Sequence, residues 1–197
     1  MSFCQTLSSH LPSALRFTVL AALVAVLSVS AFSQKKFSRT YPAPNNVRLQ
    51  LMNKRGTVTV EGWNRAEIQI TATLEAPAAN VAPQNLSGTI VINLVKDNQD
   101  RSDIGNVNFT VRVPYTTMVD IETRMGNLNV SNVRGGLVRA RISTEGDITL
   151  TNIGASAVSA ENVTGDIFYD CDIVAGGTYR FASTRGAINL RIPFNLS

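Results

Sequence analysis

Apolar and polar residues alternate along most of this 197-residue chain. The alternation has a period of two, which is typical of β-strands with one buried face. Clear examples lie at 47–51, 58–60, 68–74 and 107–113. Helical periodicity is absent from the sequence that follows the segment 1–33. The pattern therefore predicts an all-β fold.

The second half of the chain is a set of repeats, with a glycine at the same place in each copy: Gly126, Gly146, Gly165 and Gly186. A more distant copy surrounds Gly56. One unit of this size cannot bury its own apolar face, so such repeats form a core by stacking. We expect each glycine to be a structural turn residue, and Asp147 and Asp166 to bind the backbone of the turns that contain them.

Two architectures fit these repeats. In a parallel β-solenoid the chain turns a corner at each glycine, whereas in an antiparallel β-sandwich or meander each glycine begins a hairpin. A hairpin at Gly165 has a credible register, but one at Gly146 needs a bulge.

Columns of equivalent residues favour the solenoid, because stacked units would make them lateral neighbours. Glu122, Arg141 and Glu161 would alternate in charge. Asn132 and Asn152 would form an inward amide ladder. The apolar column would contain Leu128, Ile148, Ile167 and Ile188. We therefore predict a parallel β-solenoid with rungs of roughly 20 residues and additional N-terminal strands.

The segment 1–33 has the composition of a secretory signal peptide. An uncharged apolar run at 17–29 precedes small residues at the expected cleavage site, 31–33. We expect 34–46 to be an extended leader and 47–197 to be a single β-repeat domain, with N-terminal strands at 47–114 and regular rungs at 115–197. The predicted location is exported: periplasmic, cell-surface or extracellular.

Removing that segment also removes the only histidine, His10, and leaves Cys171 as the only cysteine. Histidine-based catalysis and histidine metal sites are then excluded, and no sequence motif indicates a cofactor. We expect Cys171 to be a buried small residue. Asp170 and Asp172 could hold calcium only as a minor alternative. The basic residues are spread among acidic ones, which argues against nucleic acid as a partner.

A polar strand face offers the clearest candidate binding surface. Its residues include Asn129, Thr149 and Thr151. The only tryptophan, Trp63, is interpreted first as a residue that closes the end of the core and second as one that stacks on a sugar.

Three groups of residues resemble a known family. They are the segment 53–63, the strand 111–114 with the following 119–123, and the Gly-Asp-Ile turns at 146–148 and 165–167. In this order they resemble the bacterial "putative adhesin" family of unknown function. The resemblance implies an exported, β-solenoid-like domain and supplies neither a catalytic residue nor a ligand.

The leading functional hypothesis is an exported, non-enzymatic protein with an adhesive, structural or assembly role. The alternatives are a carbohydrate-binding module and a glycan-active enzyme that uses two of the carboxylates. Partners could include an envelope glycan. A second copy of the chain could also bind through the C-terminal rung, where strand 188–192 offers unpaired backbone groups.

Overall fold

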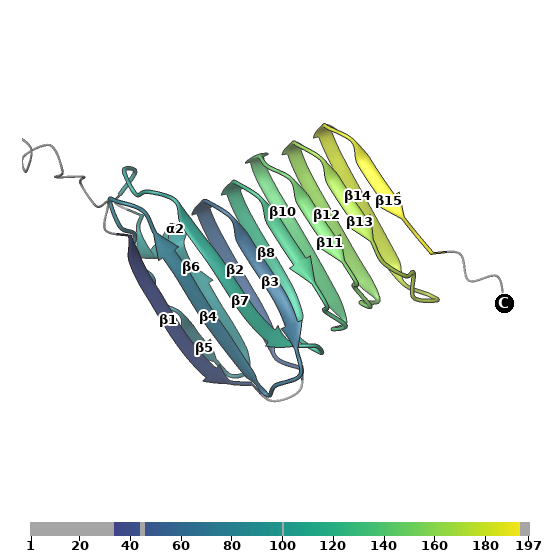
Figure 1. The fold of residues 1–197 in the computed structure, drawn as a ribbon, viewed down its shortest axis with the longest axis horizontal. Coiled ribbons are helices and arrows are strands. Elements are labelled where there is room, and N and C mark those ends of the chain that lie inside the picture. The colour runs from purple at the N-terminus through teal and green to yellow at the C-terminus, as the bar shows by residue number, and fades with distance from the viewer. Residues whose placement is uncertain (1–33, 44–45, 100, 194–197) are drawn as a thin grey trace, which may run out of the picture. The chain divides into compact units, whose positions relative to one another are not determined.

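The computed structural model describes residues 34–43, 46–99 and 101–193, so the predicted signal peptide, 1–33, lies outside the described residues. The described chain forms two β-sheets and one helical turn, α2 (Leu94–Asp97) (Figure 1). Sheet A has the strand order β1 (Lys35–Pro42), β4 (Glu67–Leu74), β7 (Val107–Pro114), β3 (Val58–Trp63), β9 (Leu128–Ser131), β11 (Ile148–Thr151), β13 (Ile167–Asp170), β15 (Ile188–Arg191). Sheet B has the order β14 (Thr178–Arg185), β12 (Ala157–Thr164), β10 (Leu137–Glu145), β8 (Met118–Met125), β2 (Arg48–Arg55), β6 (Thr89–Asn93), β5 (Gln84–Leu86).

Each sequence repeat contributes one strand to sheet B and the next strand to sheet A, and we call such a pair a repeat unit. Units β8–β9, β10–β11, β12–β13 and β14–β15 lie side by side with their strands parallel. The charged column is present as predicted, because Arg141 pairs with Glu122 on one side and with Glu161 on the other. The expected all-β, solenoid-like fold with parallel sheets is therefore confirmed, and the antiparallel alternative is wrong for the repeats.

The glycines of the repeats stack on one another at the corner between the two sheets. Gly146 has φ +147°, and a Cβ atom there would lie 2.2 Å from the carbonyl oxygen of Gly126. The same contact recurs along the column, since a Cβ at Gly165 would lie 2.2 Å from the oxygen of Gly146. The glycine spacing in the sequence thus reflects a close backbone approach between units as well as a turn conformation.

The first repeat unit has neighbours on both sides. Strand β3 pairs in parallel with β9 and also with β7, and β2 pairs in parallel with β8 and β6. Strands β6 and β7 therefore act as a further unit on the outer side of β2–β3. The chain makes the β2–β3 unit, passes outward to make β6 and β7, and then returns to place β8–β9 on the opposite side.

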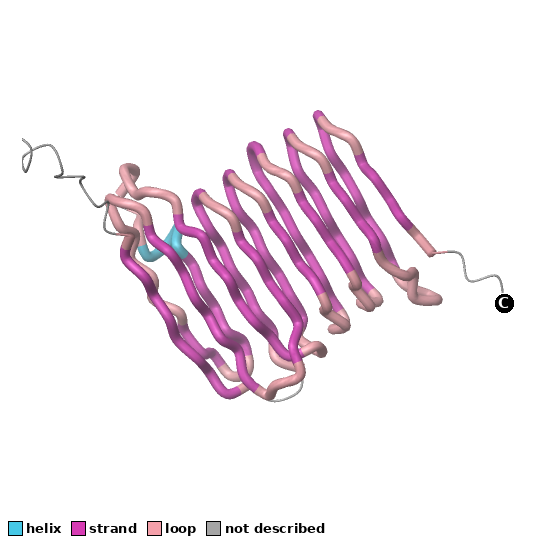
Figure 2. Tube along the Cα trace, in the orientation of Figure 1, coloured by secondary structure: helices cyan, strands magenta, loops and turns pink. Residues whose placement is uncertain are grey.

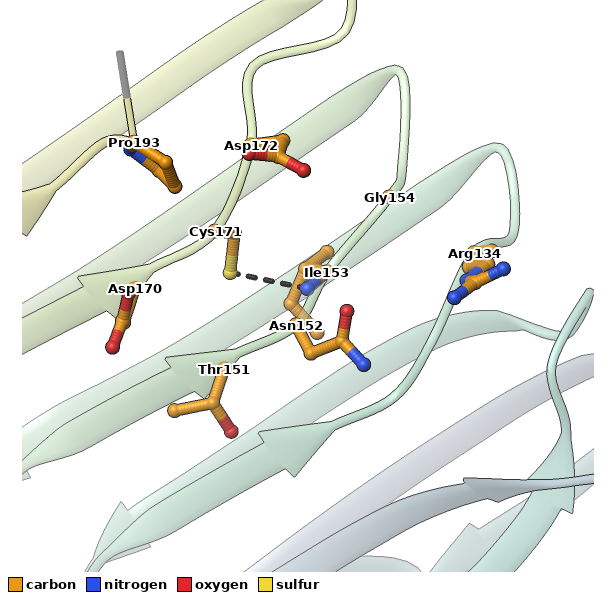
Figure 3. Close-up of a pocket in the computed structure, with 9 residues that line it drawn as sticks. All are labelled: Arg134, Thr151, Asn152, Ile153, Gly154, Asp170, Cys171, Asp172 and Pro193. Carbon is orange, nitrogen blue, oxygen red and sulfur yellow. Dashed lines mark hydrogen bonds between the residues drawn. The ribbon is translucent and has the colours of Figure 1, made fainter. Parts of the chain in front are cut away.

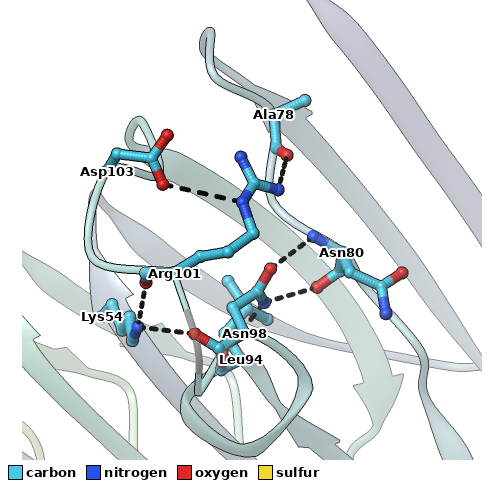
Figure 4. A network of polar contacts seen from close by, with 7 residues as sticks. All are labelled: Lys54, Ala78, Asn80, Leu94, Asn98, Arg101 and Asp103. Atoms are coloured by element: carbon cyan, nitrogen blue, oxygen red, sulfur yellow. Dashed lines mark hydrogen bonds and ion pairs between the residues drawn. The ribbon is translucent and has the colours of Figure 1, made fainter.

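This outer unit has a polar loop where the others have a glycine corner (Figure 4). The Nζ of Lys54 donates to the carbonyl oxygens of Asn98 at 3.0 Å and Arg101 at 2.9 Å. Asn98 in turn bonds the backbone of Asn80 through both its Nδ2 and its Oδ1. Since Asn98 is almost fully buried, these hydrogen bonds compensate its loss of hydration.

Antiparallel strands finish the sheets beyond this outer unit. Strand β4 pairs antiparallel with β7, β1 pairs antiparallel with β4, and β5 pairs antiparallel with β6. Figure 2 shows that strands make up most of the described chain. The expectation that 34–46 is only an extended leader is wrong for 35–42, because these residues form the edge strand β1. Exposed Lys35, Lys36 and Arg39 on this edge discourage pairing with another chain.

The core lies between the two sheets and contains the inward residues of the strands from β2 to β13 that alternate, whereas β14 and β15 at the end of the sheets have no buried residue. Leu128, Ile148 and Ile167 form one continuous buried apolar column along sheet A, as predicted. Ile188, the fourth predicted member, continues the column on β15 but is 40 % exposed. The predicted asparagine ladder also exists, with 2.7 Å from Nδ2 of Asn152 to Oδ1 of Asn132. The ladder does not point inward, because both asparagines have positive φ at the second corner and leave the inward position to Val133 and Ile153.

Candidate functional site

The outer face of sheet A carries rows of polar side chains that run across the strands. The parallel and antiparallel registers place one residue of each strand in a lateral row: Ser38, Thr71, Thr110, Thr59, Asn129, Thr149, Phe168, Asn189. The next row contains Thr40, Gln69, Arg112, Glu61, Ser131, Thr151, Asp170, Arg191. We call these two rows the polar face.

The side chains of the first row are available to a ligand. Among the described residues, the hydroxyl and amide groups of this row make no side-chain hydrogen bond within the protein, whereas Arg112 and Arg191 of the second row pair with Glu61 and Asp170. Phe168 is the one apolar member of the first row and is 37 % exposed. Asn129, Thr149 and Thr151, the residues singled out in the sequence, lie here together, and Thr59, Thr71 and Thr110 extend the face in a way that sequence reasoning missed.

Trp63 lies beside the polar face rather than at the end of the core. It follows Thr59 and Glu61 in the outward alternation of β3, and it is half-buried. Its Nε1 donates to the carbonyl oxygen of Glu67 at 2.9 Å, and the guanidinium of Arg65 lies 4.9 Å from the ring centroid. The interpretation of Trp63 as a core-closing residue is therefore wrong, because its ring packs between the turn backbone and arginine side chains.

A hollow of about 450 Å³ lies at the corner that follows β9, β11 and β13 (Figure 3). Asp170 and Asp172 contribute to its wall, together with Arg134 from the neighbouring unit. Cys171 points into the wall, where its Sγ accepts a hydrogen bond from the backbone N–H of Ile153 at 3.1 Å. Burial raises the pKa of this thiol, so the sulfur is a buried, protonated group at neutral pH.

The aspartates that follow the turn glycines bind the neighbouring unit rather than their own turn. Oδ1 of Asp147 accepts from the N–H of Asp166 at 2.8 Å, and Oδ1 of Asp166 accepts from the N–H of Ala187 at 2.8 Å. Asn127 does the same for Asp147 at 3.0 Å. These carboxylates therefore hold successive units together, and this role differs from the expected one.

On the outer face of sheet B, one nearly buried carboxylate joins three strands. Asp120 is 5 % exposed, and it accepts hydrogen bonds from Arg48 on β2 at 2.8 Å and from Arg139 on β10 at 2.7 and 2.8 Å. The Asp120 carboxylate raises the pKa of Arg139 through these hydrogen bonds and its charge. Because both carboxylate oxygens accept hydrogen bonds from arginines, Asp120 holds neighbouring units together.

Within the described ranges, no three histidine, cysteine, aspartate or glutamate side chains come together as metal ligands would. Asp170 and Asp172, the minor calcium alternative, thus have no third such ligand beside them in the part of the chain that the structure covers. No helix in the described chain is long and apolar enough to cross a membrane.

These features define the class of protein: an all-β, solenoid-like repeat protein with a broad polar sheet face. The sequence matches the Toastrack DUF4097 family over residues 22–197, and the chain belongs to that family. No protein with a curated description matches it in sequence.

One of the similar solved structures shares the fold. A "putative cell adhesion protein" from Clostridium sporogenes superposes with a TM-score of 0.59 at 11 % sequence identity, covering 82 % of this chain and all of the other (100 %). A "putative adhesin" from Bacteroides fragilis covers 82 % of this chain and 99 % of the other at 9 % identity, with a TM-score of 0.36. The family match confirms the resemblance noted in the sequence, and the superposition shows that the all-β repeat fold is shared.

Proposed function

We propose that this chain is an exported, non-enzymatic protein of the cell envelope or exterior that adheres to an extended polymer through the polar face of sheet A. The observation that carries the proposal is the alignment of unpaired hydroxyl and amide groups in a lateral row across adjacent strands. Neighbouring strands lie about 4.8 Å apart, so the row presents hydrogen-bonding groups at a regular interval. A polymer with regularly repeated polar groups can match that interval over many units.

We further propose that the architecture is a parallel β-solenoid and that the chain is exported. Each repeat forms one rung of a parallel β-solenoid, with its two strands on the two sheets. The segment 1–33 directs export, and the related structures named as adhesion proteins support a place outside the cytoplasm.

A carbohydrate-binding module is the second candidate function, and the composition of the polar face favours a carbohydrate as the polymer. Threonine, serine and asparagine dominate the first row and suit a hydroxyl-rich chain. Hydrolysis is disfavoured because Asp120, Asp147 and Asp166 are each engaged in bonds between units. These bonds occupy both oxygens of Asp120 and one oxygen each of Asp147 and Asp166, which disfavours them as the paired carboxylates that a glycosidase needs.

Co-sedimentation with insoluble envelope polysaccharide tests the proposal. The double variant Asn129→Ala/Thr149→Ala removes polar groups from the centre of the face. The matched control, Ser143→Ala/Thr184→Ala, removes exposed hydroxyls from the outer face of sheet B. We expect binding to fall in the first variant only, with no release of reducing sugar ends by any protein. Equal binding by both variants would refute a role for the polar face.

A further inference from the structure

A small aromatic hollow adjoins the polar face at the corner where β3 and β7 end. It has a volume of about 220 Å³ and is bounded by the turn 64–66 and by Pro114, Tyr115 and Thr116. Trp63 and Tyr115 contribute its two aromatic rings, and Tyr115 is 40 % exposed. Aromatic faces of this kind accept the C–H groups of a sugar ring, because they present flat apolar area at low entropic cost.

Backbone hydrogen bonds hold both walls of the hollow in place. The N–H of Tyr115 donates to the carbonyl oxygen of Trp63 at 3.2 Å, and Thr117 closes a turn by donating to Pro114 at 3.0 Å. Gly62 makes room beside them, since a Cβ there would lie 3.0 Å from Cδ1 of Tyr115 and 1.8 Å from the carbonyl oxygen of Asn132. The backbone of both walls and the Trp63 ring, whose Nε1 donates to Glu67, are thus ordered before any ligand arrives, which lowers the entropic cost of binding.

Three arginines surround the two rings. The guanidinium carbons of Arg65 and Arg112 lie 4.9 and 5.9 Å from the centroid of Trp63, and that of Arg134 lies 6.0 Å from the centroid of Tyr115. Arg65 pairs with Glu67 at 3.4 Å, and Arg112 pairs with Glu61 at 3.3 Å.

Arg134 has no carboxylate partner within 4.0 Å in the described part of the chain. Arg134 also borders the hollow of about 450 Å³ lined by Asp170 and Asp172, but neither carboxylate lies within 4.0 Å of its guanidinium. Around the two rings themselves, three cations and two carboxylates leave an excess of one positive charge.

We propose that the Trp63–Tyr115 hollow binds one acidic sugar unit of a polysaccharide, with the ring against the aromatic side chains and the carboxylate paired with Arg134. The inference rests on the proposed function, because the same polymer then continues over the polar face next to Trp63. The charge excess of one matches one carboxylate per sugar unit. A nucleic acid would need a longer basic track, and Glu61 and Glu67 interrupt one here.

The experiment uses the fluorescence of the chain's only tryptophan, which lies in the hollow. The exported protein is titrated with a short oligogalacturonate and, separately, with a neutral cello-oligosaccharide of the same length. We expect a saturable change in Trp63 emission with the acidic ligand, and at least about threefold weaker binding of the neutral one. Binding of the acidic ligand should also weaken as salt rises.

Variants that keep Trp63 locate the site. Tyr115→Ala should weaken binding about three- to tenfold through the lost ring contact. Arg134→Gln should abolish the preference for the acidic ligand, while Arg124→Gln, an exposed arginine of β8, should leave it unchanged. An unchanged emission spectrum, or equal binding of acidic and neutral ligands by the native protein, would overturn the inference.

The design separates this inference from the proposed function. The short ligands report the hollow alone, whereas co-sedimentation of long polymers reports the polar face. Long polymers that bind through the face without any response of Trp63 to short acidic ligands would reject the hollow and retain the face.

Discussion

Replacing Gly146 by alanine tests whether the repeat depends on close contact between units. The new Cβ would lie 2.2 Å from the carbonyl oxygen of Gly126, so the two units would have to separate locally. The residue would also have to keep φ near +147°. Backbone strain of this kind costs about 1–3 kcal/mol, and overpacking at a rigid contact costs about 1–3 kcal/mol more. We expect the free energy of unfolding to fall by about 2–6 kcal/mol.

Urea unfolding followed by circular dichroism measures this loss. With a slope of about 2 kcal/mol per molar urea, the midpoint should fall by about 2 M. Other glycines separate the two causes. Gly88 has φ +88° with no atom within 4 Å of a built Cβ, so Gly88→Ala tests strain alone. Gly135 lacks a positive φ but would place its Cβ 2.1 Å from the oxygen of Thr117, so Gly135→Ala tests contact alone.

Gly136→Ala is the neutral control, because this position has neither a positive φ nor any atom within 4 Å of the added Cβ. It should change stability by less than about 1 kcal/mol. If Gly146→Ala were no more destabilising than Gly136→Ala, the stacked glycine column would not be the contact that fixes the spacing of the units.

Three further predictions concern other parts of the fold. Burial raises the pKa of the Cys171 thiol and of the Tyr169 phenol, so the unfolded chain loses these protons at lower pH than the folded chain. The free energy of unfolding should therefore fall as pH rises above about 9, and urea titrations at pH 7.5 and 10 would show this fall. Asn152 has φ +51°, so Asn152→Ala should lower the free energy of unfolding by about 1–2 kcal/mol. Asn152→Gly should lower it less, because both variants lose the amide ladder but glycine tolerates that φ. Equal losses in thermal melts would contradict this prediction. Leu190 is 48 % exposed on β15, and we expect light scattering to show self-association that Leu190→Asp abolishes and Asn189→Asp, on the opposite face of the same strand, does not.

The stacking of the repeats could be predicted from the sequence because every unit repeats the same frame. Once Glu122, Arg141 and Glu161 are aligned, the register of sheet B follows, and the apolar column of sheet A follows from the glycine spacing. The direction of Asn132 was not predictable from alternation, since its positive φ shifts the inward position by one residue.

The unit formed by β6 and β7 could not be found in the same way. Gly105 precedes β7 but lies against the backbone of Glu75 and Ala76 instead of joining the glycine column. The turn of α2 with the polar loop also separates the two strands. Its position outside β2–β3 depends on pairing between segments distant in sequence, about which a local pattern carries no information.

The candidate site was predictable as far as its residues alternate with buried residues along each strand. Asn129, Thr149 and Thr151 alternate with buried residues and therefore had to share the outer face. Trp63 follows the same alternation, and this signal would have placed it outside the core. Tyr115 and Arg134 come from other loops. Tyr115 meets Trp63, and Arg134 meets Tyr115, only through the fold, so no spacing in the sequence connects these residues.

The return of the chain across β2–β3 gives the two ends of the repeat array different freedom to change length. From β10 onward each unit pairs only with the units directly before and after it in the sequence, so a duplicated or deleted copy there leaves earlier contacts intact. The β2–β3 unit is enclosed by partners that are synthesised after it on both flanks, and its surroundings are complete only once β9 has formed. Relatives should therefore differ in repeat number beyond β9, while the block from β1 to β9 is inherited as a whole.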